Sequence, residues 1–430
     1  MIPYDAFQGD HLILDADQAI GPGWVGVQNG TIVEVGEGKA PAELRARRGG
    51  PGSILAPGFV CTHTHLPLTA YRDVGHDREF LPWLLEGLIP AMSAVKNESL
   101  FYAKGARESV KALQRSGVTT IADSFLSPAG FDAMVALRAR GVFFCEVFGS
   151  LAADLELYWA EQIQRLSCLP EATSLVHVGF APHTPWTCPP AIMERVLRHG
   201  RERGKRSSLH LLESVEEQQF FLDSAGPIYD LVQKREALSR YDLGMSPVRW
   251  LKERNLLGPD LLAVHLVQAS EEDIQDLATS KTEVVHCPRS NLKLAEGIAP
   301  ILPMLEAQVS LSLGCDSLAS VGTLDYFEEM RSFLLTQRGH YRRVGCLTGK
   351  TAFAMATTGG AQALGLGGRV GRLAPGFAAD LMLVGCDAPS ADSCASVVDT
   401  LVHCGTPSGV ECTVVDGSVV WDVTSGGASS

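Results

Sequence analysis

The sequence predicts an α/β fold, a distorted TIM-like (β/α)8 barrel with a small β-sandwich domain built from both termini. Short apolar runs alternate with amphipathic helical windows through the middle of the chain, which is typical of repeated β-α units and a parallel sheet. Both ends are rich in strand-forming residues instead. We therefore expect residues 1–57 and 366–430 to form the β-sandwich domain and residues 58–365 to form the barrel.

The two ends of the chain carry the β-domain signals. Asn29–Gly30 separates two β-rich runs within residues 24–35, and this dipeptide is a strong hairpin signal. Residues 379–385 and 411–421 have the same β-rich character near the other end. A single small domain accounts for both ends, and two unrelated edge hairpins are the alternative.

Eight apolar runs in the middle segment are interpreted as strands. They end near His65, Asp123, Phe148, His183, Glu213, His265, His286 and Asp316. The clearest intervening helices are expected over Glu98–Ser116, Phe131–Arg140, Pro190–Arg203 and Glu271–Ala278. Eight parallel strands close most naturally into a barrel, which gathers their carboxyl ends around one site. An open, doubly wound sheet is the alternative, and it would spread the same strand ends along a line.

The first apolar run, Ser53 to Val60, is interpreted as one buried strand that leads into His63 and His65. Side chains two residues apart on a strand point the same way, so the two imidazoles can face one ion. Alone this pair is weak evidence, because two histidines at a strand end are also found simply hydrogen-bonded.

The other strand ends strengthen the interpretation as a metal site. His210, His265 and Asp316 each terminate a different apolar run, so a barrel brings them to the same end as the first histidine pair. Nitrogen and oxygen ligands with an open position suit a catalytic zinc ion, or iron, rather than a closed structural site. Glu213 follows His210 by three residues and could reach a coordinated water without being a ligand, as a general acid/base must.

Charge and composition favour a small-molecule substrate. With 36 Lys and Arg against 49 Asp and Glu, the net charge is −13, and no basic stripe is present, so a nucleic-acid partner is not expected. The 11 cysteines include no CxxC pair, which favours reduced thiols and a cytoplasmic location. The N-terminus lacks the pattern of a signal peptide, and no stretch approaches the ~20 apolar residues of a membrane span.

Six segments carry a family pattern: Pro57–Leu66, His210–Glu213, Val264–His265, His286–Asn291, Leu313–Ser317 and Gly371–Leu381. Together they resemble the amidohydrolase superfamily, and in particular its mononuclear aminohydrolase branch of nucleoside deaminases and chlorohydrolases. The branch that bridges two metals has a carboxylated lysine on its fourth strand, whereas residues 175–183 contain no lysine. The resemblance therefore implies one metal per chain.

The resemblance also implies a role for each strand-end residue. Four residues would hold one zinc ion, or an iron ion in its place: His63, His65, His210 and Asp316. His265 would orient water and substrate, Glu213 would transfer the proton, and Asp316 would also accept one. The implied reaction is hydrolytic deamination, in which hydroxide adds to an aromatic carbon bearing an amino group and ammonia leaves.

The segment after the fourth strand, Ala181 to Thr187, resembles that of deaminases acting on methylthioadenosine and adenosylhomocysteine. The likeness to aminofutalosine deaminases is closer still, and it rests on residues 144–149, 209–217, 287–291 and 316–320. His183 is expected to meet a ribose hydroxyl, and the other predicted substrate contacts are Glu146, Arg72, Arg289 and Ser317. A buried structural role for Glu146 is equally compatible with the sequence, and surface positions are the commoner outcome for the arginines. Cys315 and Val321 depart from the usual threonine and asparagine, which leaves the exact substrate open.

Several alternatives remain. A barrel that has kept its shape but lost its chemistry would be a binding protein. Within the enzymes, the same site could dechlorinate an aminotriazine or deaminate guanine or another free base. Phe80 and Trp83, together with residues 84–88, could form a lid over the pocket or a helix in a homodimer interface.

Overall fold

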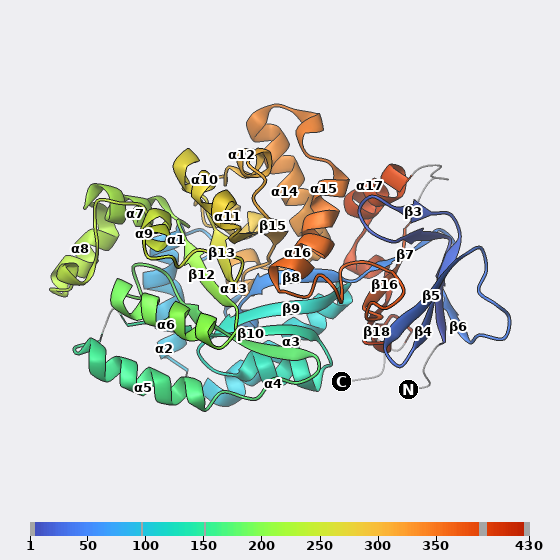
Figure 1. Cartoon of the computed structure of the whole chain (residues 1–430), viewed down its shortest axis with the longest axis horizontal. Helices are drawn as coiled ribbons and strands as arrows, with labels where there is room; N and C mark the ends of the chain where they lie inside the picture. Colours follow the sequence, from blue (N-terminus) through green and yellow to red (C-terminus); the bar gives the residue numbers. More distant parts are fainter. Residues whose placement is uncertain (1–4, 96–97, 150–151, 387–393, 425–430) are drawn as a thin grey trace.

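The predicted barrel is confirmed by the computed structural model, which describes residues 5–95, 98–149, 152–386 and 394–424 (Figure 1). Eight parallel strands pair in the order β15-β14-β13-β12-β11-β10-β9-β8. Their bounds are β8 Phe59–Thr64, β9 Val118–Phe125, β10 Arg140–Val147, β11 Val176–Pro182, β12 Ser207–Leu211, β13 Leu261–His265, β14 Glu283–His286 and β15 Leu311–Leu313. The backbone N–H groups of Cys315 and Asp316 donate to the His63 carbonyl oxygen at 3.0 and 3.1 Å, which nearly closes the barrel.

Helices surround this sheet (Figure 1). The longer ones are α3 Glu98–Arg115, α4 Ala129–Ala136, α5 Leu155–Ser167, α6 Pro190–Glu202, α8 Gly226–Lys234, α10 Glu271–Ser280, α14 Tyr326–Tyr341 and α17 Cys394–Cys404. The shorter ones are α1 Phe80–Pro82, α2 Ile89–Ser93, α7 Val215–Gln218, α9 Pro247–Glu253, α11 Pro288–Lys293, α12 Ile301–Glu306, α13 Leu318–Val321, α15 Gly349–Ala354 and α16 Gly360–Ala363. Two further helical segments after β8, η1 Leu66–Tyr71 and η2 Trp83–Leu88, lie near the strand ends.

One expected helix has different bounds. The window Phe131 to Arg140 forms α4 only as far as Ala136, and Arg140 is the first residue of β10. Arg138 has a φ of 55° and ends the helical path, so the chain can turn directly into the strand. Arg140 is fully buried, which the helical interpretation of this window did not anticipate.

Strands from both termini form two further sheets, with the orders β5-β4-β1-β6 and β18-β17-β16-β7-β2-β3. Their bounds are β1 Ala6–Gly9, β2 His11–Ile13, β3 Ala19–Ile20, β4 Gly23–Gln28, β5 Thr31–Glu37, β6 Ala46–Arg48, β7 Ser53–Pro57, β16 Leu381–Gly385, β17 Val410–Val415 and β18 Ser418–Asp422. The sheets share an apolar cluster that includes Phe7, Val25, Leu55 and Leu381. The expected hairpin joins β4 to β5, and φ is 51° at Asn29 and 78° at Gly30, as a type I′ turn requires.

The apolar run from Ser53 to Val60 is two strands rather than the single strand expected. β7 pairs with β16 in a terminal sheet, whereas β8 starts at Phe59 and pairs with β9 in the barrel. Gly58 is the junction, where its N–H donates to the Asp380 carbonyl oxygen at 3.1 Å and a Cβ would lie 2.1 Å from Thr119 Cγ2. Hydrophobicity alone could not reveal the change of sheet, because both strands are buried along their whole length.

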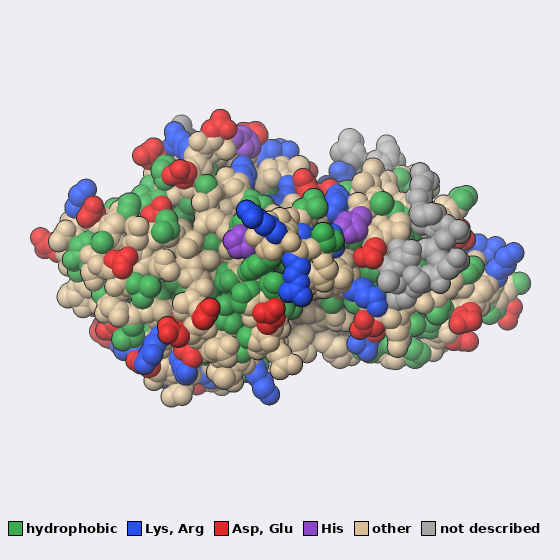
Figure 2. All heavy atoms as spheres, turned by 90° about the horizontal axis from the view of Figure 1, so that it is seen from above, with side chains coloured by type: hydrophobic (Ala, Val, Ile, Leu, Met, Phe, Trp, Pro, Cys, Tyr) green, Lys and Arg blue, Asp and Glu red, His purple; other side chains and the backbone are tan. Residues whose placement is uncertain are grey.

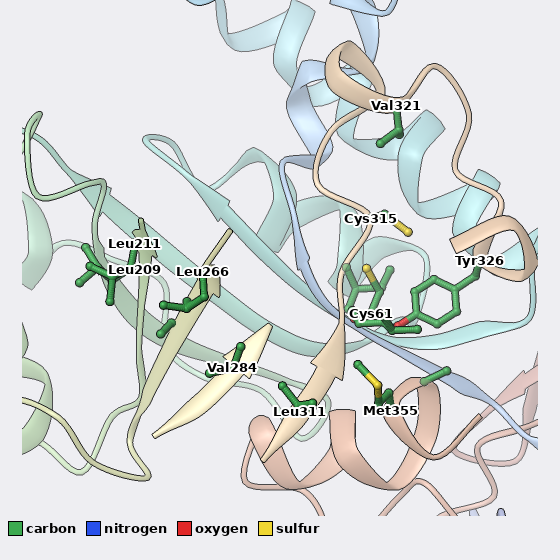
Figure 3. Packing of buried hydrophobic residues seen from close by; sticks show 14 of the residues in the cluster. Cys61, Leu209, Leu211, Leu266, Val284, Leu311, Cys315, Val321, Tyr326 and Met355 are labelled. Carbon is green, nitrogen blue, oxygen red and sulfur yellow. The ribbon is translucent and has the colours of Figure 1, made fainter. Parts of the chain in front are cut away.

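The barrel interior is packed below the strand ends. The hydroxyl oxygen of Tyr326 lies 2.6 Å from the Val60 carbonyl oxygen and 2.8 Å from that of Leu313, so it bridges the first and last strands. Figure 3 shows the Tyr326 ring beside Cys61 and Cys315. All three side chains are fully buried. This packing fixes the strand ends that carry the histidines.

The outer surface is mixed in charge. On the face shown in Figure 2, acidic and basic side chains are interspersed among hydrophobic and uncharged ones. Among the described residues, no helix has both the length and the apolar character needed to cross a lipid bilayer.

Candidate metal centre and active site

Three histidines converge at the carboxyl ends of the strands. His63 and His65 extend from the end of β8 and His210 from β12, and the Nε2 atom of His210 lies 3.2 Å from Nε2 of each of the other two. The Nδ1 atom of His65 is 2.6 Å from the Ser124 carbonyl oxygen, and that of His210 is 2.7 Å from the His183 carbonyl oxygen. Both Nδ1 atoms therefore carry a proton, which directs the Nε2 atom of each ring toward the common point.

Asp316 faces the same point from the end of β15. Its Oδ1 atom lies 3.7 Å from His63 Nε2 and 3.4 Å from His65 Nε2. Its Oδ2 atom accepts hydrogen bonds from the hydroxyls of Ser290 and Ser320, both at 2.6 Å. The backbone φ of 57° at Asp316 is in the left-handed region, which is uncommon for a residue other than glycine. The two serines thus leave one carboxylate oxygen free to face the histidines.

This donor set fits a divalent metal ion. Ligand atoms of His63, His65 and His210 all lie within 4.8 Å of one another. Imidazole nitrogens with their lone pairs directed at one point repel each other unless a proton or cation lies between them, and carboxylate oxygen adds negative charge. Backbone carbonyls that hold the far ring nitrogens are the usual outer partners of metal-binding histidines. Three nitrogens and one oxygen are a ligand set typical of zinc.

Glu213 and His265 lie beside this point. Glu213 Oε1 is 3.3 Å from His265 Nε2, and both side chains are buried. The loop that carries Glu213 is held by Glu217, whose carboxylate accepts the N–H groups of Leu212 and Glu213 at 3.1 and 3.2 Å. Burial raises the pKa of Glu213 above 4.5, although the neighbouring His265 opposes this. Glu213 is therefore positioned as a proton carrier with a pKa moved toward neutrality.

A cavity of about 700 Å³ opens onto these residues. Among the site residues described or predicted above, those that line the cavity are His65, Glu146, His183, His210, Glu213, Asp316 and Ser317. The opposite wall is apolar and comes mainly from the segment after β8: Leu68, Phe80, Trp83, Leu84, Leu85, Leu88, Ile89 and Met92. The segment around Trp83 therefore forms part of the cavity wall. The indole N–H of Trp83 donates to the Val74 carbonyl oxygen at 3.1 Å, which ties this wall to the preceding loop.

Three predicted substrate contacts reach the cavity. The ring of His183 stacks on Phe148 with centroids 4.3 Å apart, and its Nδ1 atom is 2.7 Å from the Thr187 hydroxyl. Burial lowers the pKa of His183 to about 3, so the ring is neutral near pH 7. Glu146 Oε1 lies 3.6 Å from His65 Nδ1 and has no hydrogen-bond partner among the described residues. Ser317 lines the cavity next to Asp316.

The two predicted arginines are placed elsewhere. Arg72 is exposed at the end of η1 and does not line the cavity. The Arg289 guanidinium donates to the carbonyl oxygens of Val321 and Thr323 at 3.2 and 2.9 Å and pairs with Glu329 at 3.3 Å. Its charge is thus used to fasten the loop after α13, away from the cavity. The substrate contact predicted for these two arginines is not supported by their positions.

The structure adds two residues that the sequence pattern did not indicate. Arg235, just after α8, lines the cavity and is exposed. Glu296 is buried close to Glu213 and His265, with one ligand atom of each within 4.8 Å of the others. Neither residue ends an apolar run or belongs to a recognisable motif, so no sequence signal singled them out.

Known proteins share this architecture along nearly the whole chain. The amidohydrolase family model matches residues 54–420. A 5-methylthioadenosine/S-adenosylhomocysteine deaminase of Syntrophobacter fumaroxidans is 32% identical over 422 residues, which span 96% of this chain and 91% of that protein. The crystal structure of an adenosine deaminase from Xanthomonas campestris with bound Zn gives a TM-score of 0.82 at 26% identity, covering 96% of this chain and 92% of that one.

A Helicobacter pylori aminofutalosine deaminase, solved in complex with methylthio-coformycin, gives a TM-score of 0.79. It covers 97% of this chain and 100% of its own, at 21% identity. A likeness at this identity establishes a common fold and nothing finer.

Proposed function

The chain belongs to the amidohydrolase family, and from this premise we propose that it is a zinc-dependent deaminase of adenine nucleosides. It would replace the amino group on the purine ring with a carbonyl and release ammonia. The observation that carries the proposal is the convergence of His63, His65, His210 and Asp316 on one point next to a cavity that the last three of them line. Glu213 lies beside them with its carboxyl buried.

We propose that these four residues hold a single divalent ion, zinc in the first instance and iron as the alternative. The solved adenosine deaminase relative with bound Zn supports this choice of metal. A bound zinc ion lowers the pKa of a coordinated water toward neutrality, which supplies a nucleophile at physiological pH. Hydrogen bonds from Ser290 and Ser320 would keep the Asp316 carboxylate oriented toward the metal ion.

Proton transfer is assigned to Glu213. Its carboxylate would take a proton from the hydrolytic water and deliver it to the ring nitrogen next to the carbon under attack. His265 Nε2, 3.3 Å from Glu213 Oε1, is placed to hold the water and the new oxygen substituent in position. Loss of ammonia then restores the ring with a carbonyl. Water contributes the oxygen atom, and its two protons leave on the ring nitrogen and on ammonia.

The shape of the cavity supports a nucleoside with a large 5′ substituent. An adenine ring over the metal ligands would place its ribose toward His183 and Glu146, which carry a ring nitrogen and a carboxylate oxygen. Much of the remaining lining is apolar and includes Leu85, Leu88 and Met92. A free base such as guanine would leave this part of the cavity unfilled. The relative named for methylthioadenosine and S-adenosylhomocysteine is consistent with this class.

The test is a substrate panel measured on the purified, zinc-loaded protein. Aminofutalosine, methylthioadenosine, adenosylhomocysteine, adenosine, guanine and a chlorotriazine would be compared by ammonia or chloride release, with the adenine-to-hypoxanthine absorbance change as a second readout. We expect the highest kcat/KM with adenine nucleosides that carry a large 5′ substituent. A preference for guanine or for the triazine, with inert nucleosides, would replace this proposal by one of the alternative hydrolytic reactions. Inactivity with the whole panel despite full metal loading would favour a binding protein.

Two further proposals concern the protein as a whole. A cytoplasmic location is supported by buried cysteines that form no disulfide, such as Cys61, Cys145 and Cys188. The place of Trp83 and Leu88 on the cavity wall supports a lid rather than a homodimer contact for that segment. Light scattering would establish whether a homodimer forms through another surface.

A further inference from the structure

Glu296 is a buried acidic residue next to the proton carrier of the proposed site. It follows α11 after Ala295, whose φ of 58° turns the chain back toward the barrel. Its N–H donates to the Asn291 carbonyl oxygen at 2.9 Å, and its carbonyl oxygen accepts from the Gln268 side-chain amide at 2.8 Å. The backbone on both sides is therefore fixed. Only 7% of Glu296 and 6% of Glu213 is exposed, and one carboxylate oxygen of each lies within 4.8 Å of the other, so water has little access to the pair.

The hydrogen bonds around Glu296 are incomplete for an ionised carboxylate. When the Asn291 side-chain amide is oriented as a donor, its nitrogen lies 3.1 Å from Glu296 Oε2 and 2.8 Å from His265 Nδ1. The other oxygen, Oε1, has no donor among the described residues. This is unexpected for a residue with a purely structural role, because buried carboxylate oxygens without partners are costly.

The charges around this pair disfavour two carboxylates. Glu213, Asp316 at the end of β15 and Glu216 on α7 are the acidic groups that face Glu296, and His265 is the neighbouring base. Burial and the negative charge of Glu213 raise the pKa of Glu296 well above 4.5. The hydrogen bond from Glu296 in turn acts to lower the pKa of Glu213. These effects favour one proton held between the two carboxyl groups.

We propose that Glu296 is a positioning residue for Glu213: its protonated carboxyl donates a hydrogen bond that holds the Glu213 carboxylate ready to accept the proton of the hydrolytic water. The inference rests on the proton-transfer role proposed above for Glu213. Asn291 completes the arrangement, because one amide nitrogen contacts both Glu296 and the ring of His265. Hydrogen bonds thus connect the loop after β12, the end of β13 and α11, which carry Glu213, His265 and Asn291.

Two substitutions of nearly equal volume separate this role from simple packing. Glu296→Gln keeps a donor toward Glu213, whereas Glu296→Met fills the same space without one. We expect Glu296→Gln to stay close to the wild-type kcat. Glu296→Met should lower kcat about 10- to 100-fold with little change in KM, the scale for losing a hydrogen bond to a charged group. The acidic limb of the kcat/KM profile should move to higher pH in Glu296→Met only, because Glu213 would lose the donor that stabilises its anion.

The same substitutions in a Glu213→Gln background provide the coupling control. If Glu296 acts through Glu213, Glu296→Met should cause no further loss once Glu213 is replaced. An equal loss in both backgrounds would show a general packing role and overturn the proposal. Equal losses in Glu296→Gln and Glu296→Met would also overturn it, because a donor at this position would then be irrelevant.

An infrared difference spectrum gives a readout that does not depend on turnover. The wild-type minus Glu296→Gln difference spectrum at neutral pH should contain a carboxylic acid C=O band, which isolates Glu296 from the other buried carboxyl groups. Absence of that band from the difference spectrum would show that Glu296 is ionised and would overturn the proposal. A protein that shows the band but deaminates none of the panel substrates would instead contradict the proposed function, so the two failures are distinguishable.

Discussion

The Nε2 atoms of His65 and His210 lie 3.2 Å apart, while the Nδ1 atom of each ring is held by a backbone carbonyl oxygen. Neither ring can rotate away without breaking its carbonyl contact, and the two Nε2 atoms repel each other unless a proton or a cation lies between them. A cation bound between the rings converts that repulsion into two coordinate bonds. The folded chain therefore maintains a site whose free energy falls when a metal binds.

The first prediction concerns metal content. Purified protein should contain one tightly bound divalent ion per chain, and His210→Ala should lose it because one of the nitrogen ligands is removed. The matched control is His177→Ala, since His177 is an exposed histidine on β11. Elemental analysis after gel filtration is the measurement. Two equivalents held with equal affinity would contradict a mononuclear site, and full metal content in His210→Ala would contradict the assigned ligands.

The second prediction separates metal binding from proton transfer. Glu213→Gln preserves the shape of the side chain but removes the basic oxygen, so metal content should stay near normal. Turnover should fall by about two to four orders of magnitude, the usual scale for an acid/base group. Glu272→Gln is the control, because Glu272 is an exposed acidic residue on α10. If Glu213→Gln retained full activity, the proton would have to be carried by another group, with His265 the first to examine.

The third prediction concerns Arg235 at the cavity. Its side chain is exposed and lines the cavity, so its charge is available to a substrate. Arg235→Gln should lower kcat/KM for nucleosides whose 5′ substituent ends in a carboxylate by about three- to tenfold, the scale of an exposed charge contact. Methylthioadenosine, which carries no such charge, should be unaffected. Arg72→Gln serves as the control, because Arg72 is exposed and does not line the cavity. Equal losses with charged and uncharged nucleosides would refute a charge contact.

The fourth prediction follows from His286, which is buried at the end of β14 against Phe333. Burial lowers the pKa of His286 from 6.5 to about 3. Between these two values the unfolded chain binds more protons than the folded chain, so His286 makes stability rise with pH through this window and fall as the solution is acidified.

The difference in unfolding free energy between wild type and His286→Gln should therefore shrink by up to about 1.4 kcal/mol per pH unit as the pH falls below about 6. Urea titrations of both proteins at several pH values are the measurement, and taking the difference cancels the protonation of the metal-site histidines. A pH-independent difference would show that His286 is charged in the folded protein or that water reaches its ring.

The sequence predicted the barrel and the convergence of the proposed metal ligands because both depend on local signals. His63 and His210 lie near the carboxyl ends of buried strands and Asp316 follows another, and the alternation of strands with helices fixes where parallel strand ends meet. The structure also reveals a change of sheet that no local sequence signal indicates. Gly58 changes the chain from one sheet to another inside a continuous apolar run, and only the contact with Thr119 reveals why glycine is needed there.

The polar residues around the metal ligands were harder to assign from sequence. Arg289 lies on α11 and Arg235 directly follows α8, yet only Arg235 lines the cavity. The direction of each side chain is set by tertiary contacts, such as the carbonyl oxygens of Val321 and Thr323 around the Arg289 guanidinium. These contacts cannot be inferred from the charge of a residue or from its position along the chain.

The last prediction tests how the terminal strands are joined to the barrel. We propose that residues 1–57 and 366–430 form one β-domain and residues 58–365 the barrel, with Arg140 on β10 as a link between them. The Arg140 Nε atom lies 2.7 Å from Asp380 Oδ2, and one of its terminal nitrogens is 3.0 Å from Asp416 Oδ1. The side chains of Arg140 and Asp380 are only 2% and 1% exposed, so removing the cation would leave a buried carboxylate uncompensated. Arg140→Leu should therefore lower the unfolding free energy by about 3–5 kcal/mol.

Arg369→Leu is the matched control, because exposed Arg369 lies 3.8 Å from the same Asp416 carboxylate, and a surface pair of this kind contributes about 0–1 kcal/mol. Denaturant titrations of the three proteins compare the two losses. Similar small losses in both variants would mean that water or a rearranged loop neutralises Asp380, and that the two parts are held together mainly by apolar packing.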